Sequence, residues 1–120
     1  MYRLDKPRKV DLETTLYVDV HEDAESGQAR FVLDEPDTGL ELEVTLGSLP
    51  PTFIELRLRV KGHEAMVVTQ EGAETFRIVD EGPARLSLVG SFRSGDARGQ
   101  VEIIVRPSLG VKWSTLVAQR

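Results

Sequence analysis

Two histidines occur in the 120 residues, and each stands beside carboxylates. His21 precedes Glu22 and Asp23, and His63 precedes Glu64. Histidine and carboxylate side chains together could bind a metal ion or move a proton in a hydrolytic enzyme. Neighbouring residues of a strand point to opposite faces, and neighbours in a loop have no fixed geometry, so this spacing does not build a ligand set. We expect no metal site and no cofactor, and keep a small metal-dependent hydrolase as an alternative function.

The acidic residues around the first histidine form a second candidate site, at positions 19–25. Carboxylates are the ligands that calcium prefers. The segment lacks the Asp-x-Asp-x-Asp-Gly spacing of a calcium-binding loop. We interpret it as a solvated surface loop, and the sequence leaves open whether it binds calcium.

Nucleophilic catalysis has no signature in the chain. There is no cysteine, which excludes thiolate catalysis, disulfides and cysteine-built zinc sites. The serines Ser48, Ser94 and Ser108 lie in turn-like segments, and none has the Gly-x-Ser-x-Gly context of an activated serine. We therefore predict no catalytic residues and no enzymatic activity.

Paired carboxylates for glycoside chemistry are the remaining catalytic option. Glu41, Glu43 and Glu55 lie close together in sequence, but they face Arg57 and Arg59 in the hairpin described below. A carboxylate beside a guanidinium stays ionised and is a poor general acid. We interpret these residues as cross-strand ion pairs.

The charge of the chain restricts its partners. A formal net charge of −5 works against binding a phosphate backbone, so we expect no nucleic acid. Lys6, Arg8 and Lys9 form a small basic group near the N-terminus, which we interpret as part of a solvated tail. No apolar run approaches the ~20 residues of a membrane span, so we expect no membrane association and a cytoplasmic location.

Aromatic side chains offer a different kind of binding site. Tyr17 and Phe53 fall on the polar faces of predicted strands, and Trp113 lies in the last one. Rings exposed on a sheet could stack on sugars or contact a protein. A carbohydrate-binding module that uses these three rings is therefore an alternative function. The competing interpretation is that a second sheet covers them, with Trp113 in the core or sealing an edge.

The elements that would position these residues are strands, and the clearest are two that fold back on each other. Apolar and polar residues alternate over Leu40–Leu46 and again over Ile54–Val60, which predicts strands with one buried face. Pro50 and Pro51 between them cannot donate to a ladder, so a hairpin follows. The predicted register pairs Val44 with Leu56, Leu42 with Leu58, Glu43 with Arg57 and Glu41 with Arg59.

Further alternating segments extend this pattern over the whole chain. Val10–Val20 shows the longest alternation and predicts an eleven-residue strand, and the apolar run Met66–Val68 predicts a strand covered on both sides. Nine candidate strands are separated by glycine and proline turns. The sequence predicts an all-β fold, an antiparallel β-sandwich of about seven to nine strands without a substantial helix. Residues 1–9 form a tail and residues 10–118 a single domain.

The order of these features resembles the small transthyretin-like, or carboxypeptidase-regulatory-like, β-sandwich domains of bacterial proteins. The residues that carry the resemblance are Leu40–Leu46, Pro50–Leu56, Thr75–Ile78, Gly82–Leu86 and the closing Trp113–Leu116. Glu71-Gly72-Ala73-Glu74 only approximates the Asp-x-x-Gly turn of that family. The resemblance implies a bacterial, non-catalytic module with no active residues.

Together these observations predict a non-enzymatic binding or assembly domain. An exposed sheet face or edge would engage a protein partner or a second copy of the chain, because a short sandwich leaves several strand edges to pair. A small-molecule ligand is not expected. The residues predicted to bind a ligand or partner are Tyr17, Phe53, Arg57, Arg59 and Trp113.

Overall fold

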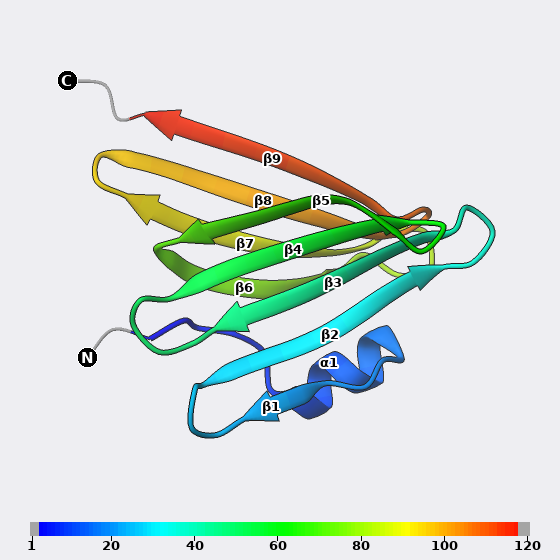
Figure 1. Ribbon diagram of the computed structural model, residues 1–120, viewed down its shortest axis with the longest axis horizontal. Coiled ribbons are helices and arrows are strands. Elements are labelled where there is room, and N and C mark those ends of the chain that lie inside the picture. The colour runs from blue at the N-terminus through cyan, green and yellow to red at the C-terminus, as the bar shows by residue number, and fades with distance from the viewer. Residues whose placement is uncertain (1–2, 118–120) are drawn as a thin grey trace.

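The computed structural model describes residues 3–117 and consists mainly of two antiparallel sheets (Figure 1). One short helix precedes nine strands in the described residues: α1 (Lys9–Leu16), β1 (His21–Asp23), β2 (Gln28–Glu35), β3 (Leu40–Gly47), β4 (Phe53–Val60), β5 (His63–Glu71), β6 (Ala73–Asp80), β7 (Leu86–Ser94), β8 (Ala97–Arg106) and β9 (Gly110–Val117). The first sheet has the order β1-β2-β3-β4-β5 and the second β6-β7-β8-β9. The predicted all-β fold is confirmed.

The β3–β4 hairpin has the predicted register. Val44 lies opposite Leu56 and Leu42 opposite Leu58, while Glu43 lies opposite Arg57. A shift by one residue would turn one strand's apolar side chains to solvent, and for this reason the alternation determines the register.

The core lies between the sheets and contains apolar side chains from both. Phe31 of β2 and Phe76 of β6 contact each other across it, with ring centroids 6.5 Å apart. Gly90 of β7 allows close approach of the sheets, since a Cβ atom there would lie 2.5 Å from Cδ1 of Ile54 on β4. Glycine is thus required at this point by packing between the layers.

The chain passes from one sheet to the other at Gly72, where a turn was predicted. Gly72 has a φ of +80°, and its N–H donates to the carbonyl of Thr52 at 2.9 Å. The carbonyl of Gly72 accepts from the N–H of Arg93, and the Thr52 hydroxyl donates to the carbonyl of Ala73 at 2.7 Å. This corner fixes the end of β5 against the second sheet.

The prediction of a strand over Val10–Val20 is wrong, because most of this segment forms helix α1. Leu12 and Leu16, four residues apart, are buried on one face of the helix, whereas Val10 is 51% exposed. A segment in which every second residue is apolar also has apolar residues four positions apart, and this spacing places them on one face of a helix. Packing of this one apolar face against the sheets favours the helix over the strand.

Residues 4 and 5 are part of the fold, although a solvated tail was expected there. Leu4 is buried, and its N–H donates to the carbonyl of Ser48 at 3.2 Å. Asp5 forms a parallel bridge with Thr75, and its carbonyl accepts from the N–H of Phe76 at 2.8 Å. The segment therefore covers the edge of β6 that the sheet itself leaves unpaired.

The expectation that Met66–Val68 is covered on both sides is also wrong. These residues belong to β5, an edge strand, and Met66 and Val67 are 44% and 42% exposed. A continuous apolar run indicates burial only when a second layer lies on each face. Within residues 3–117 no helix is long and apolar enough to cross a membrane.

Candidate protein-binding surface and cleft

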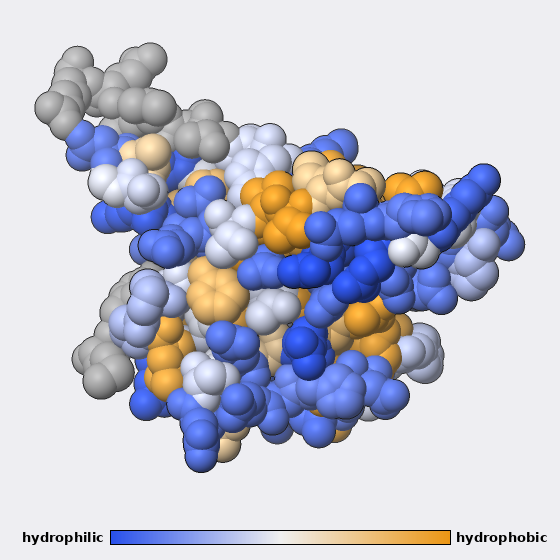
Figure 2. All heavy atoms as spheres, viewed as in Figure 1, coloured by the Kyte–Doolittle hydropathy of each residue, from blue (hydrophilic) through white to orange (hydrophobic). Residues whose placement is uncertain are grey.

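Strand β5 presents an open edge that is exposed over most of its length. It pairs with β4 on one side, and no described strand pairs with it on the other. Met66 faces the second sheet and Val67 faces the opposite way, and both remain accessible to solvent. Apolar side chains stand among hydrophilic ones in the upper part of the molecule, where β5 runs (Figures 1 and 2). Such an edge has free backbone donors and acceptors for another strand.

The outer face of the same sheet is covered by cross-strand ion pairs. Arg59 of β4 binds two carboxylates of β3, with 3.1 Å to Glu41 and 3.0 Å to Glu43. Arg57 lies 2.9 Å from Glu64 of β5 and 3.6 Å from Glu55. The hydrogen bonds that Arg59 donates to Glu41, and then to Glu43, raise the pKa of Arg59 above its ordinary value. Both predicted arginines are thus engaged with carboxylates within the chain.

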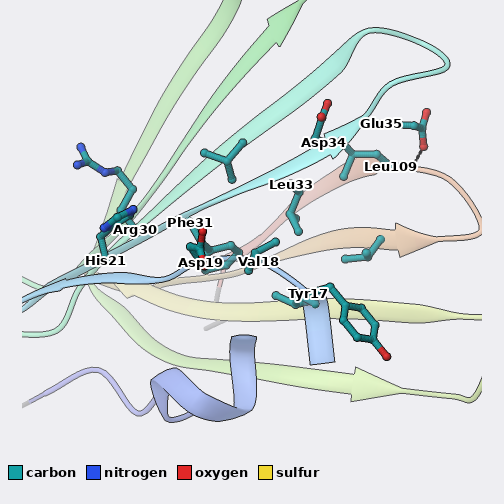
Figure 3. A pocket seen from close by; sticks show the side chains of 13 residues that line it. Tyr17, Val18, Asp19, His21, Arg30, Phe31, Leu33, Asp34, Glu35 and Leu109 are labelled. Atoms are coloured by element: carbon teal, nitrogen blue, oxygen red, sulfur yellow. Dashed lines mark hydrogen bonds between the residues drawn. The ribbon is translucent and has the colours of Figure 1, made fainter. Parts of the chain in front are cut away.

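A cleft of about 490 Å³ opens at the other end of the sheet, beside β2 (Figure 3). Strand β1 pairs with β2 only over residues 28–30 of β2, and His21 opposite Arg30 is the last pair. The same register would place Val20 opposite Phe31, but the N–H of Val20 donates instead to the carboxylate of Glu13 at 3.1 Å. The chain before β1 therefore turns toward helix α1, and the edge of β2 beyond Arg30 stays open.

The cleft has an apolar floor and an acidic rim. Leu33, Val105 and Leu109 contribute apolar side chains, while Asp19 and Asp34 lie on opposite sides of the opening (Figure 3). Neither aspartate forms an ion pair with another described residue, in contrast to the carboxylates on the outer face. The remaining lining residues are Leu16, Tyr17, Val18, His21, Arg30, Phe31, Val32 and Glu35.

Glu35 ties the end of β2 to the turn between β8 and β9. Its carboxylate accepts from the N–H of Leu109 at 2.7 Å and from the hydroxyl of Thr38 at 2.8 Å. The hydrogen bond from Leu109, followed by that from Thr38, holds the pKa of Glu35 below its ordinary value. One wall of the cleft is thus fixed by a contact between the two sheets.

The three predicted aromatic residues lie in separate places. Tyr17 follows helix α1 in a left-handed conformation, with a φ of 56°, and is 88% exposed at the cleft. Phe53 begins β4 and packs over Gly47 of β3. Trp113 of β9 packs against Phe92 at a ring-centroid distance of 5.8 Å and is partly buried. They do not form one stacking platform.

The two histidines belong to opposite edges of the first sheet. His21 begins β1 and His63 begins β5, with three strands between them. Among residues 3–117 no group of three histidine, cysteine or acidic residues is arranged to hold a metal ion. In the acidic loop, the carboxylate of Asp23 accepts from the N–H of Glu25 at 3.0 Å, a turn contact. Hydrogen bonds from Glu25, and then from Ser26, lower the pKa of Asp23.

The sequence predicted the ion pairs of the outer sheet face, but it did not predict the exposed edge of β5 or the cleft. Met66 and Val67 were noticed as an apolar run, but only the strand order shows that they lie at an edge. The cleft depends on helix α1, and the sequence signal for that helix was the four-residue spacing of Leu12 and Leu16.

Comparisons with known proteins give one informative result. No family model matches the sequence, and the comparison with curated proteins finds no match either. The fold is similar to that of a chain in a contact-dependent growth inhibition toxin–immunity protein complex from Klebsiella pneumoniae 342, with a TM-score of 0.83 and 15% identity. The match covers 97% of this chain and 100% of that chain. This similarity establishes the all-β architecture.

Proposed function

We propose that this chain is a protein-binding domain whose partner is a toxin, and that it acts as the immunity component that blocks that toxin. The observation that carries the binding role is β5, a nine-residue edge strand with solvent-exposed apolar side chains on both faces. An extended segment of a partner can pair with such an edge through backbone hydrogen bonds, while pockets on the two faces select side chains.

The choice of a toxin as the partner rests on the fold. The similar chain belongs to a toxin–immunity protein complex, and the match extends over both chains almost completely. The net charge of −5 would favour association with a partner that has a basic surface, because opposite charges attract. A protein that blocks a toxin by binding to it needs no catalytic residues.

Co-expression tests this function. The chain is produced together with the protein encoded beside it, and the complex is sought by size-exclusion chromatography with light scattering. We expect a complex of defined stoichiometry, and we expect cells to survive expression of the neighbouring protein only when the chain is present. Separate elution together with loss of viability in the presence of the chain would refute the proposal.

A second candidate is self-association through the same edge. Antiparallel pairing of two β5 strands centred on Val67 would place Met66 opposite Val68 and His63 opposite Glu71 of the other copy. Apolar pairs at the centre and a charge-compatible pair at the ends favour this register. Native mass spectrometry of the isolated chain distinguishes the two candidates. A chain that is monomeric alone and forms a complex only when the toxin is added excludes self-association.

A further inference from the structure

We propose that the cleft beside β2 binds an extended, cationic segment of the protein partner, which adds to the open edge of β2 at residues 31–35. This inference rests on the proposed function, since it assigns a second contact to the same partner. It concerns a different surface, because β2 and β5 are separated by β3 and β4 in the sheet.

The edge of β2 is open for a structural reason. Strand β1 contains only three residues, and its last pair with β2 is His21 opposite Arg30. The segment that precedes β1 is held away by the hydrogen bond from the N–H of Val20 to Glu13 and by the left-handed turn at Tyr17. No backbone hydrogen bond joins residues 17–20 to residues 31–35 within the described chain. Backbone groups on this side of β2 are therefore available to an added strand.

The size and lining of the cleft suit a short piece of extended chain. Its volume of about 490 Å³ is within the range of ligand-binding clefts. Leu33, Val105 and Leu109 supply an apolar floor, and Tyr17 and Val18 also line the cleft, with the Tyr17 ring directed away from Leu33 (Figure 3). Alternate side chains of an added strand would point to the floor, and the others to the rim.

The charge at the rim determines the kind of segment. Asp19 and Asp34 are exposed and form no ion pair with another described residue, and Glu35 adds a third carboxylate. Arg30, the one basic lining residue apart from His21, already lies 3.8 Å from Glu43 on the outer face. Lysine or arginine at the rim-facing positions of the segment would form ion pairs with Asp19 and Asp34. The occupant is thus an alternating apolar and cationic strand.

The first experiment uses a defined peptide, so that it does not depend on the partner. A blocked peptide Thr-Lys-Val-Lys-Val-Thr is titrated into the ¹⁵N-labelled full chain, and amide chemical shifts are recorded. We expect shifts confined to residues 17–21 and 30–35, and weaker binding as salt rises, because surface charges are screened. The matched peptide Thr-Glu-Val-Glu-Val-Thr is expected to cause none. Equal shifts with both peptides, shifts on β5, or no shifts would overturn the proposal.

A double variant locates the charges. Asp19→Asn with Asp34→Asn is expected to weaken lysine-peptide binding about three- to tenfold, since two exposed ion pairs are lost. Asp37→Asn, an exposed acidic residue in the turn after β2 and outside the cleft, is the matched control and is expected to have no effect. Equal binding by the double variant and the control would show that these aspartates do not recognise the peptide.

The same variants separate this proposal from the proposed function. If the neighbouring protein binds the chain and the double variant binds it equally well, the cleft is not part of the interface and the protein-binding role stands. If that protein does not bind but the lysine peptide does, the cleft recognises cationic strands and the toxin assignment fails.

Discussion

The two ends of the five-stranded sheet expose strand edges of different kinds. Strand β5 has nine residues, and no strand of the described chain pairs with its outer edge. At the other end, β1 covers only the first three residues of β2, and the open part lies in a cleft beside helix α1. The first edge is flat and accessible, whereas the second is recessed and bordered by charges.

If the proposed function holds, these two edges would contact a partner in two different ways. A flat edge with apolar side chains accepts many strands and needs other features for selectivity. A recessed edge with an apolar floor and two unpaired aspartates accepts only a segment of suitable shape and charge. Ala29, Phe31 and Leu33 of β2 also belong to the core, whereas no residue of β5 does. Substitutions of the core residues of β2 should therefore mainly lower the stability, and substitutions in β5 should mainly lower the affinity for a partner.

The largest expected effect on stability is at β2. Phe31→Ala removes a fully buried ring that contacts Phe76 across the sheets, and we expect a loss of about 3–5 kcal/mol in the free energy of unfolding. Urea unfolding followed by circular dichroism measures it. Val67→Ala on β5 is the control and should change stability by no more than about 0.5 kcal/mol, because the side chain is already largely exposed. Similar losses for both variants would remove the distinction between the edges.

The largest expected effect on binding is at β5. Val67→Lys places a charge at the centre of the exposed strand, where it disfavours strand pairing, and we expect a roughly 30-fold loss of partner affinity with little change in melting temperature. Isothermal titration calorimetry against the co-expressed partner measures it. Val79→Lys on β6 provides the matched control, because Val79 is 36% exposed and Val67 is 42% exposed. Unchanged affinity for Val67→Lys would show that the partner does not use this edge.

A smaller, pH-dependent effect is expected at the wall of the cleft. The pKa of Glu35 is held below its ordinary value of 4.5 by the hydrogen bonds from Leu109 and Thr38, so its ionised form stabilises the fold above that pH. This contribution is lost as the pH falls through the lowered pKa. Glu35→Gln should therefore lower the melting temperature at pH 7, and the difference from the original chain should shrink as the pH falls below 4.5. A difference that stays constant with pH would contradict this assignment.

The smallest effect is expected on the outer face between the two edges. Arg59→Gln removes contacts with Glu41 and Glu43, and we expect a small decrease in melting temperature that is reduced further at high salt. Thermal unfolding at low and high ionic strength measures it. Lys112→Gln, on β9 of the other sheet, serves as the control for loss of one positive charge. A large loss that is insensitive to salt would mean that Arg59 packs rather than pairs.

Several features of the fold followed from local pattern. The hairpin of β3 and β4 combined alternation with two prolines and matched charges, so its register was predictable residue by residue. The segment Val10–Val20 was not, because its residues satisfy a strand period and a helix spacing at once. The pairing of Arg57 and Arg59 with carboxylates on the outer face was predictable. The apolar edge and the cleft were not, since each depends on which strands are neighbours.

The sequence by itself determined that the chain alternates between apolar and polar residues, turns at glycine and proline, and has no cysteine and a net charge of −5. Those properties depend on residue type and spacing alone. Only the tertiary structure decided that β5 lies at an edge, that residues 9–16 coil into a helix, and that the chain before β1 leaves β2 uncovered. The physical reason is that exposure and pairing are set by contacts between segments distant in sequence, which a local period does not specify.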